Sequence, residues 1–409
     1  MSVSWSNVFA ARTSRMKASD IRELLKLTAR PEIISLAGGL PAPELFPIDE
    51  YRRAFEWVLE TNGSAALQYG PSEGYRPLRE LLATRMTGMG IPAMADQVLI
   101  TNGSQQGLDL VGKIFLNPGD AVCLENPSYM GAIQAFDSYQ ADYVIVPMDD
   151  DGMRAEELDL ILTKRPAKFI YALPNFQNPS GRWMSTERRK ILVDTAKKHG
   201  IPIIEDDPYG ELRFEGEARP SLRSLWPEGV IYLGTFSKIL APGFRLGWMV
   251  IPETAYDEVV FGKQPADLHT SMATQMATYE VCRQDGFLDA HVERIREVYR
   301  ERRDVMLRAL EAHFPEGCTW TRAQGGLFVW AELPPSVDAR DLLVDALEEN
   351  VAFVPGQSFH ADRSGHNTIR LNFSNVSSDR IEEGIARLGR AITRRLARVG
   401  TRPEVAVSP

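Results

Sequence analysis

The amino-acid sequence predicts an α/β protein with a mostly parallel sheet that helices cover on both faces, together with a smaller α+β unit. The chain has 409 residues, more than one hydrophobic core usually serves, so we expect a large domain with a smaller companion. Its 44% hydrophobic and 25% charged residues are typical of a globular protein with a sizeable core. The order of β-rich runs and helical patterns divides the chain into two kinds of structure.

The large sheet is predicted from runs rich in β-branched and aromatic residues that alternate with helical patterns. That alternation needs crossover connections, which give parallel strands buried on both faces. One intervening helix has clear ends, because Ser185 can cap its start and Gly200 can stop it. The expected strands are residues 98–101, 121–125, 143–147, 169–173, 201–205, 230–234 and 246–251.

After about residue 286, long charged helices replace this alternation, and residues 289–314 are expected to bridge two domains. Strands are expected at 327–332, 351–354 and 368–373, followed by a terminal helix at 381–398. We therefore divide the chain into an N-terminal segment (1–50) that joins the small domain, a large domain (51–300) and a small C-terminal domain (301–409).

Composition excludes several classes of protein. A net charge of -9 disfavours a nucleic-acid surface, which needs clustered basic residues. Cys123, Cys282 and Cys318 are odd in number and form no CxxC pair, so neither a disulfide framework nor a metal site is expected. No apolar run reaches the roughly 18 residues of a membrane span. We expect a cytoplasmic protein, although the basic residues within 1–19 also resemble an organelle transit peptide.

Polar residues cluster directly after the predicted strands. In open parallel sheets, ligands bind at the carboxyl ends of the strands, and those ends share one edge. We therefore expect the clusters to meet there and to form the active site. They are Ser104 with Gln105, residues 126–129, 175–181 and 206–209, and Thr235 to Lys238.

Each cluster also has an ordinary structural interpretation. The loop from Gly103 to Gln106 leads into a helical pattern and can cradle a phosphate, but a glycine turn with a serine cap is the more common structure. Asp206 ends an apolar strand, where a buried charge needs a cation, yet acidic residues before Pro208 are also usual in turns. Lys238 emerges from an apolar strand, where a lysine that loses its proton can attack carbonyl groups, although most lysines are only solvated.

The combined spacing of these motifs resembles one known family. The set comprises Asn178-Pro-Ser-Gly181, Asp206 with Tyr209, and Ser237-Lys238 followed by Arg245, and it resembles the fold-type-I, class I/II aminotransferases. The similarity extends over nearly the whole chain, through residues 35–47, 67–74 and 367–372. Residues 19–25, 103–106 and 127–131 look closest to the branch of 2-aminoadipate and kynurenine aminotransferases.

The resemblance implies pyridoxal 5'-phosphate as the cofactor and a role for each matched residue. Lys238 would carry the cofactor as a Schiff base and act as general acid and base. Asp206 would pair with the pyridine nitrogen, while Tyr209 and Asn178 would hydrogen-bond the phenolic oxygen. Tyr129 would stack on the ring, and a core tyrosine is its structural alternative.

The same resemblance implies a phosphate site and a partner subunit. Ser104, Gln105, Ser237 and Arg245 would bind the phosphate, with partial positive charge from the helix N-terminus. Tyr69 would reach the phosphate of the neighbouring subunit, which implies a homodimer. Neither a nucleic acid nor a membrane is an expected partner.

Substrate binding is assigned by resemblance as well. Arg370 would clamp the α-carboxylate with two parallel hydrogen bonds, beside Asn178 and the Gly39 backbone. Arg22, at a predicted helix start, would meet the distal carboxylate of a dicarboxylic substrate. Taken alone, such arginines are usually surface residues, and loop glycines usually serve turns. The expected substrates are amino acids of the 2-aminoadipate, glutamate, leucine or aromatic type, with their 2-oxo acids.

Two other functions fit parts of the sequence. A lyase or racemase with the same cofactor would use nearly the same residues, and only its product would distinguish it. Related domains also occur in winged-helix regulators, but the about 30 residues before the family match are too few for such a module. The acidic charge also disfavours DNA. We therefore expect an aminotransferase.

Overall fold

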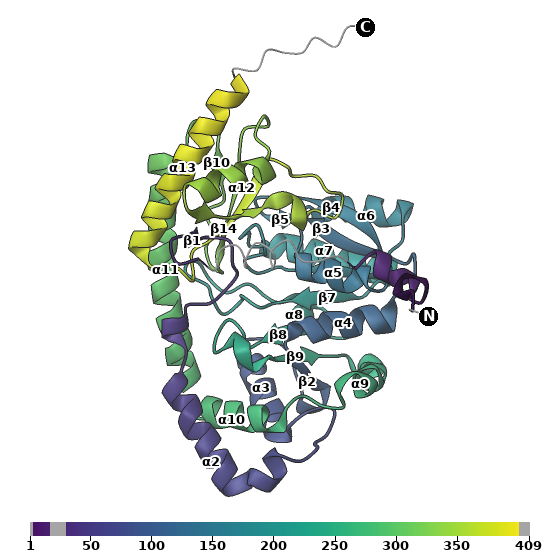
Figure 1. The fold of residues 1–409 in the computed structure, drawn as a ribbon. Helices are drawn as coiled ribbons and strands as arrows, with labels where there is room; N and C mark the ends of the chain where they lie inside the picture. Colours follow the sequence, from purple (N-terminus) through teal and green to yellow (C-terminus); the bar gives the residue numbers. More distant parts are fainter. Residues whose placement is uncertain (1–2, 17–29, 401–409) are drawn as a thin grey trace.

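The computed structural model describes residues 3–16 and 30–400 and shows a central sheet with helices around it, beside a smaller second sheet (Figure 1). The central sheet has eight strands in the order β2-β9-β8-β7-β6-β3-β4-β5. The predicted α/β architecture is confirmed, and each predicted strand of this sheet lies close to its expected bounds. The strands are β2 (Val98–Asn102), β3 (Ala121–Asn126), β4 (Asp142–Asp149), β5 (Gly152–Met153), β6 (Phe169–Ala172), β7 (Ile203–Asp206), β8 (Val230–Thr235) and β9 (Leu246–Val250).

Strand direction decides which loops can meet. Strands β4, β3, β6, β7 and β8 are parallel neighbours. Strand β9 is antiparallel to β8, because the connection from Phe236 to Arg245 is too short for a crossover, and it is also antiparallel to β2. These two reversals leave β2 in the direction of β8. The carboxyl ends of β2, β3, β6, β7 and β8 therefore share one edge of the sheet.

Helices cover both faces of the central sheet. On one face, α4, α5 and α9 contribute Leu108, Phe136 and Val259 to a single apolar core. On the other face, α6 and α7 contribute Leu158 and Leu192 to a second core. The parallel strands between them are buried on both sides, as two-sided coverage requires. These helices are α4 (Ser104–Phe115), α5 (Met130–Asp137), α6 (Ala155–Lys164), α7 (Thr186–His199), α8 (Leu222–Leu225) and α9 (Glu253–Asp267).

Helix α7 begins and ends at the residues that its sequence predicts. The Ser185 hydroxyl accepts a hydrogen bond from the backbone N–H of Arg188 at 3.3 Å, which caps the start. Gly200 follows the last turn with a φ of 64°, the left-handed conformation that glycine adopts without a steric cost. This helix is the connection between β6 and β7, so its ends fix where those strands leave the sheet edge.

The second sheet has four antiparallel strands in the order β10-β11-β14-β13. The prediction of one strand at 351–354 is wrong. The chain instead forms β12, which pairs in parallel with β1, and then β13, which pairs with β14, because the buried Phe353 lies where the backbone changes partner. The strands are β1 (Ile34–Ser35), β10 (Thr319–Trp320), β11 (Phe328–Glu332), β12 (Val351–Ala352), β13 (Val354–Pro355) and β14 (Thr368–Asn372).

The long helix α11 (Phe287–His313) connects the regions of the two sheets and runs beside α13 (Ser378–Gly400) (Figure 1). Because α11 continues through residue 300, the domain boundary there stays a prediction. The N-terminal segment contacts both regions: Arg15 donates to the Ala141 carbonyl, while β1 joins β12. The remaining helices are α2 (Ile48–Ala66), α3 (Arg76–Gly88), α10 (Met272–Cys282) and α12 (Ala339–Glu348). Short 3₁₀ turns are η1 (Trp5–Asn7), η2 (Ala11–Ser14), η3 (Pro43–Leu45), η4 (Ala95–Gln97), η5 (Pro242–Phe244) and η6 (Gly356–Phe359).

Within residues 3–16 and 30–400, no helix has the length and apolar character needed to cross a membrane. The same ranges contain no group of three or more His, Cys, Asp or Glu side chains arranged to hold a metal ion. Cys123, Cys282 and Cys318 are free thiols, and burial raises the pKa of each.

Candidate active site

A cavity of about 510 Å³ lies at the carboxyl edge of the central sheet, and we call it the edge cavity. Side chains from the ends of β2, β3, β6, β7 and β8 line it, together with Arg370 from β14 and Gly39 from the segment after β1. The predicted site residues that it brings together are Gly39, Ser104, Gln105, Tyr129, Asn178, Asp206, Tyr209, Ser237, Lys238, Arg245 and Arg370.

Lys238 follows β8 and is half-buried at the edge cavity. Its ammonium group donates a hydrogen bond to the Gly39 carbonyl at 2.8 Å. Burial and the positive charges of Arg370 and Arg245 lower the pKa of Lys238 to about 8. No carboxylate in the described part of the chain forms an ion pair with it. Lys238 is therefore more readily deprotonated than a solvated lysine, as a nucleophilic amine must be.

Arg370 is a buried guanidinium without a carboxylate partner among the described residues. It donates to the Asn178 side-chain carbonyl at 2.9 Å and to the Ala37 carbonyl at 2.7 Å. Its carbon lies 4.2 Å from the ring centre of Phe328 and 4.9 Å from that of Phe359. Burial lowers the pKa of Arg370 to about 10. A buried cation held only by neutral groups is suited to an anionic ligand.

Three consecutive carboxylates at the end of β7 have different partners. Glu205 accepts from the backbone N–H groups of Leu222 and Arg223, at 2.9 Å each, and so caps α8. Asp206 accepts from the Tyr171 hydroxyl at 2.7 Å through Oδ2, while its buried Oδ1 has no hydrogen-bond partner in the described chain.

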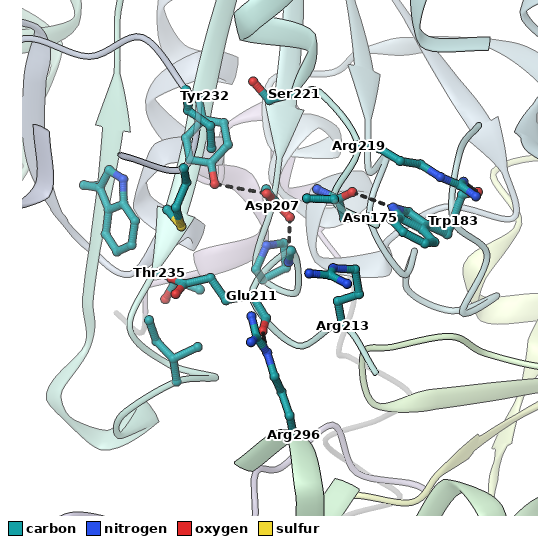
Figure 2. Close-up of a pocket in the computed structure, with 17 residues that line it drawn as sticks. Asn175, Trp183, Asp207, Glu211, Arg213, Arg219, Ser221, Tyr232, Thr235 and Arg296 are labelled. Atoms are coloured by element: carbon teal, nitrogen blue, oxygen red, sulfur yellow. Dashed lines mark hydrogen bonds between the residues drawn. The ribbon is translucent and has the colours of Figure 1, made fainter. Parts of the chain in front are cut away.

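Asp207 has the turn role that its position before proline allows. It accepts from the Gly210 backbone N–H at 2.8 Å and from the Tyr232 hydroxyl at 3.0 Å. It lines a second cavity of about 240 Å³, the rear cavity, which does not include Asp206 (Figure 2). The turn interpretation therefore holds for Asp207. Asp206, in contrast, lines the edge cavity with one oxygen unpaired.

The loop between β2 and α4 faces Arg245. Gly103 has a φ of 71° and forms the N-cap of α4, so Ser104 is the first helical residue and the serine-cap interpretation is wrong. A Cβ on Gly103 would come within 2.5 Å of the Arg245 guanidinium, which shows how closely the two approach. Ser237 accepts a hydrogen bond from Thr235 at 2.9 Å. Helix N–H groups, two hydroxyls and a guanidinium thus face one corner, which favours a phosphate-like anion.

Two aromatic hydroxyl residues complete the wall. The Asn178 side-chain amide donates to the Tyr209 hydroxyl at 3.5 Å, and burial raises the pKa of Tyr209. The ring of Tyr129 lies against Gly131, where any Cβ would overlap it. Gln105 donates to the Gly131 carbonyl at 3.0 Å, so α4 and α5 are joined beside the cavity.

Comparison with known proteins assigns the fold and the chemistry to a family. The model of the aminotransferase class I and II family matches residues 32–388. The chain belongs to this family. It is a pyridoxal-phosphate-dependent aminotransferase, as its similarity to named relatives also indicates. The match favours amino-group transfer over the lyase and racemase alternatives.

The aminotransferase is 48% identical to a 2-aminoadipate transaminase of Thermus thermophilus over 97% of this chain and 99% of the relative. It is 44% identical to aromatic-amino-acid aminotransferase 1 of Thermococcus litoralis, over 95% and 94% respectively. Among solved structures, an α-aminoadipate aminotransferase of Thermus thermophilus, complexed with N-(5'-phosphopyridoxyl)-L-leucine, has a TM-score of 0.91. The two sequences are 46% identical, covering 97% of this chain and 100% of that one.

Two predicted site residues lie elsewhere in the aminotransferase. Tyr69 is 77% exposed and does not line the edge cavity; its ring meets His269 edge-on, with 5.9 Å between ring centres. Arg22 lies outside the described residues, so its predicted position is untested.

Several contributors were not predicted from the sequence. Tyr171, Phe328, Phe359 and the Ala37 carbonyl each contact a predicted residue directly. Tyr171 had a usable signal, since a phenol within a fully apolar strand needs a hydrogen-bond partner. The two phenylalanines come from β11 and η6, far away in sequence, and no local pattern distinguishes them from other core residues.

The pKa of Asp206 leads to a prediction about the stability of the cofactor-free aminotransferase. Burial raises the pKa of Asp206 to about 7. Between about pH 4 and 7 the unfolded chain has lost this proton and the folded chain has kept it, so stability falls as pH rises through that window. Asp206→Asn removes the effect and keeps an acceptor for Tyr171. We expect the variant to have a Tm roughly 2 to 5 °C above the parent at pH 8 and a smaller difference at pH 5.

Differential scanning calorimetry of cofactor-free protein at both pH values measures this. A difference between parent and variant that is the same at pH 5 and pH 8 would show that the pKa of Asp206 is not raised.

Proposed function

We propose that the edge cavity holds pyridoxal phosphate and transfers an amino group between an L-amino acid and a 2-oxo acid, with Lys238 as the catalytic residue. One observation carries the proposal. Lys238, Arg370 and Asp206 line the same cavity, and none has an ion-pair partner among the described residues. A cofactor with a ring cation and a substrate with a carboxylate would supply two of the missing charges.

The residues fit the cofactor ring. The unpaired Oδ1 of Asp206 suits a protonated pyridine nitrogen, because a buried carboxylate is stabilised by a charged donor. Tyr209 and Asn178 suit the phenolic oxygen, which their hydroxyl and amide would hold as an anion. Tyr129, at the start of α5, suits a stacking role on the ring face.

The corner at the N-terminus of α4 fits the phosphate. Ser104, Gln105, Ser237 and Arg245 line it, and the first N–H groups of α4 are free of helical partners. Within the described chain, the Arg245 side chain donates only to the Pro242 carbonyl, at 3.3 Å, so its guanidinium keeps donors for an anion.

When bound, pyridoxal phosphate supplies a carbonyl carbon that exchanges the amino group and a protonated ring that withdraws electrons from the substrate. Lys238 would act on protons in this reaction: its Nζ would take the proton from the substrate α-carbon and return it to the carbon on the other side of the transferred nitrogen. A pKa of about 8 places this amine near neutrality, where it can both accept and donate. A cofactor and substrate that fill the edge cavity would exclude water and protect the transferred proton.

Arg370 orients the amino acid. Its guanidinium would bind the α-carboxylate, with the Asn178 side chain beside it and the Gly39 backbone across the cavity. The contacts with Phe328 and Phe359 hold the guanidinium plane in place, so little freedom is lost when a carboxylate binds. The α-carbon would then lie between Arg370 and Lys238.

We propose the substrate classes that the relatives' names suggest: 2-aminoadipate and glutamate, leucine, and aromatic amino acids, with their 2-oxo acids. The relatives at 44% and 48% identity are named for aromatic amino acids and for 2-aminoadipate, and the solved structure contains a leucine adduct. A single site that accepts both acidic and apolar side chains needs a positive charge that contacts the acidic side chains and moves away from the apolar ones. We assign that charge to Arg22.

We further propose a homodimer in which Tyr69 completes the partner's phosphate site. Tyr69 lies near other exposed apolar residues, with Leu67 76% and Leu268 55% exposed. Large exposed apolar side chains that lie together mark an interface. Tyr69 contacts His269, next to Leu268, so these residues share one surface. The free thiols agree with the cytoplasm as the proposed location.

The first test concerns Lys238. Lys238→Ala should abolish amino transfer and the covalent attachment of the cofactor. In the parent enzyme, borohydride reduction and peptide mapping should place the label on Lys238. Lys263 is the control, because its side chain is fully buried and forms an ion pair with Asp267 at 2.7 Å. A label on Lys263, or on any other lysine, would overturn the assignment.

The second test separates the two substrate arginines. Arg22→Ala should lower kcat/KM for 2-aminoadipate and glutamate by roughly 10- to 100-fold and leave leucine and phenylalanine almost unchanged. Arg370→Ala, as the control, should lower kcat/KM for all four by roughly one and a half to three and a half decades. Steady-state kinetics with each donor measures both, and equal losses in the Arg22 variant would show that Arg22 does not select the side chain.

The third test uses mixed dimers. Lys238→Ala and Tyr69→Ala chains each give dimers with a defect at every site. If Tyr69 acts across the interface, a one-to-one mixture that exchanges subunits contains some sites with both residues intact, and activity returns to about a quarter of the parent by simple mixing. If Tyr69 acts within its own subunit, no mixed site is intact and activity does not recover.

A further inference from the structure

Two tyrosines reach the end of β7 from opposite faces of the central sheet. Tyr171 on β6 pairs in register with Ile204, two residues before Asp206, so the two side chains share a face. Tyr232 on β8 pairs with Glu205 and shares the other face with Asp207. Each phenol donates to one aspartate, at 2.7 Å and 3.0 Å.

The surroundings of the two aspartates differ. Asp207 receives further hydrogen bonds and borders the rear cavity, where Figure 2 shows it between Tyr232 and Asn175. Within the described chain, the Asp206 carboxylate receives only the bond from Tyr171; its Oδ1 has no partner there, and the residue lines the edge cavity. Tyr171 therefore holds one oxygen of Asp206 and leaves the other for a ligand.

Tyr171 is a rigid donor. Its side chain is fully buried, and its ring meets that of Phe136 edge-on with 5.7 Å between centres. It belongs to the core that α4, α5 and α9 form on that face of the sheet. A hydroxyl fixed in this way can neither rotate toward water nor follow Asp206 if the carboxylate turns, so it sets the orientation of the carboxylate.

We propose that Tyr171 is a positioning residue for the aminotransferase: its hydroxyl orients Asp206 and stabilises its charge, so that Oδ1 meets the cofactor's ring nitrogen. The inference rests on the proposed role of Asp206. A bond to a charged acceptor is stronger than a neutral one, and a single such bond to a buried carboxylate is its main stabilisation before a cation binds.

Other titratable groups also face Asp206. Asp207 and Tyr209 follow it in the chain, and Lys238, Tyr129 and Arg370 line the same cavity. The hydrogen bond from Tyr171 lowers the pKa of Asp206, whereas burial and the charge of Asp207 raise it. Loss of the Tyr171 hydroxyl therefore moves the ionisation of Asp206 to higher pH.

The test measures binding of pyridoxamine 5'-phosphate to cofactor-free protein, because this ligand carries the ring nitrogen and phosphate but cannot bond covalently to Lys238. Tyr171→Phe removes only the hydroxyl. We expect its dissociation constant at pH 7 to rise about tenfold, and the pH at which binding reaches half its maximum strength to move upward. Tyr232→Phe is the matched control, since it removes the phenol from Asp207, and it should change neither quantity by more than about twofold.

A double-mutant cycle assigns the effect to Asp206. In an Asp206→Asn background, Tyr171→Phe should weaken binding by less than about threefold, because the charge that the phenol stabilises is gone. Equal losses in both backgrounds, or no loss at pH 7 with an unchanged pH profile, would overturn the role of Tyr171. Equal losses in the Tyr171 and Tyr232 variants would also overturn it, since they would reflect general packing.

The Asp206→Asn variant alone separates this inference from the proposed function. If Asp206→Asn leaves pyridoxamine phosphate binding and its pH profile unchanged, the proposed role of Asp206 fails, and the role of Tyr171 fails with it. If Asp206→Asn weakens binding and Tyr171→Phe does not, only the positioning role is lost.

Discussion

The contacts of Arg370 join the parts of the molecule that form the site. The residue belongs to β14 of the second sheet, yet it donates to Asn178 in the loop after β6 of the central sheet and to Ala37 in the segment after β1. Its guanidinium lies over Phe328 of β11. A cation buried at the meeting point of three chain segments, without an acidic partner, costs stability that the surrounding carbonyls and rings only partly offset. The described fold therefore keeps a buried cation whose charge no acidic side chain balances, which is what the proposed carboxylate site requires.

The three carboxylates at the end of β7, Glu205, Asp206 and Asp207, differ in what they contact. Glu205 and Asp207 have structural roles: Glu205 accepts hydrogen bonds at the start of α8, and Asp207 accepts one that closes a turn. Asp206, between them, faces the other side of the sheet, because successive residues of a strand point in opposite directions. The two-residue period of a strand thus separates a carboxylate that lines the edge cavity from two structural ones that are chemically almost the same.

Local sequence predicted much of this and missed what depends on distant segments. The ends of β7 and β8, and the helix from Ser185 to Gly200, follow from local patterns of apolar residues and caps. The strand at 351–354 failed because a change of sheet at Phe353 depends on β1, more than three hundred residues earlier in the chain, and leaves no local trace. The distinction between Asp206 and Asp207 likewise needed the positions of Tyr171 and Tyr232, which only strand register supplies.

Helix α11 gives the two sheets a continuous mechanical link. Along one helix, Arg296 donates to the Glu211 carbonyl near the central sheet, and Tyr299 accepts from the Ala42 backbone N–H after β1. Farther on, Arg303 donates to the Ala323 carbonyl before β11. An unbroken helix has no joint about which its two ends could swivel, since sharp bends need proline, glycine or an inserted turn. Any change in the distance between the sheets therefore has to move or bend α11 as a whole, because three residues of one unbroken helix contact segments of both regions.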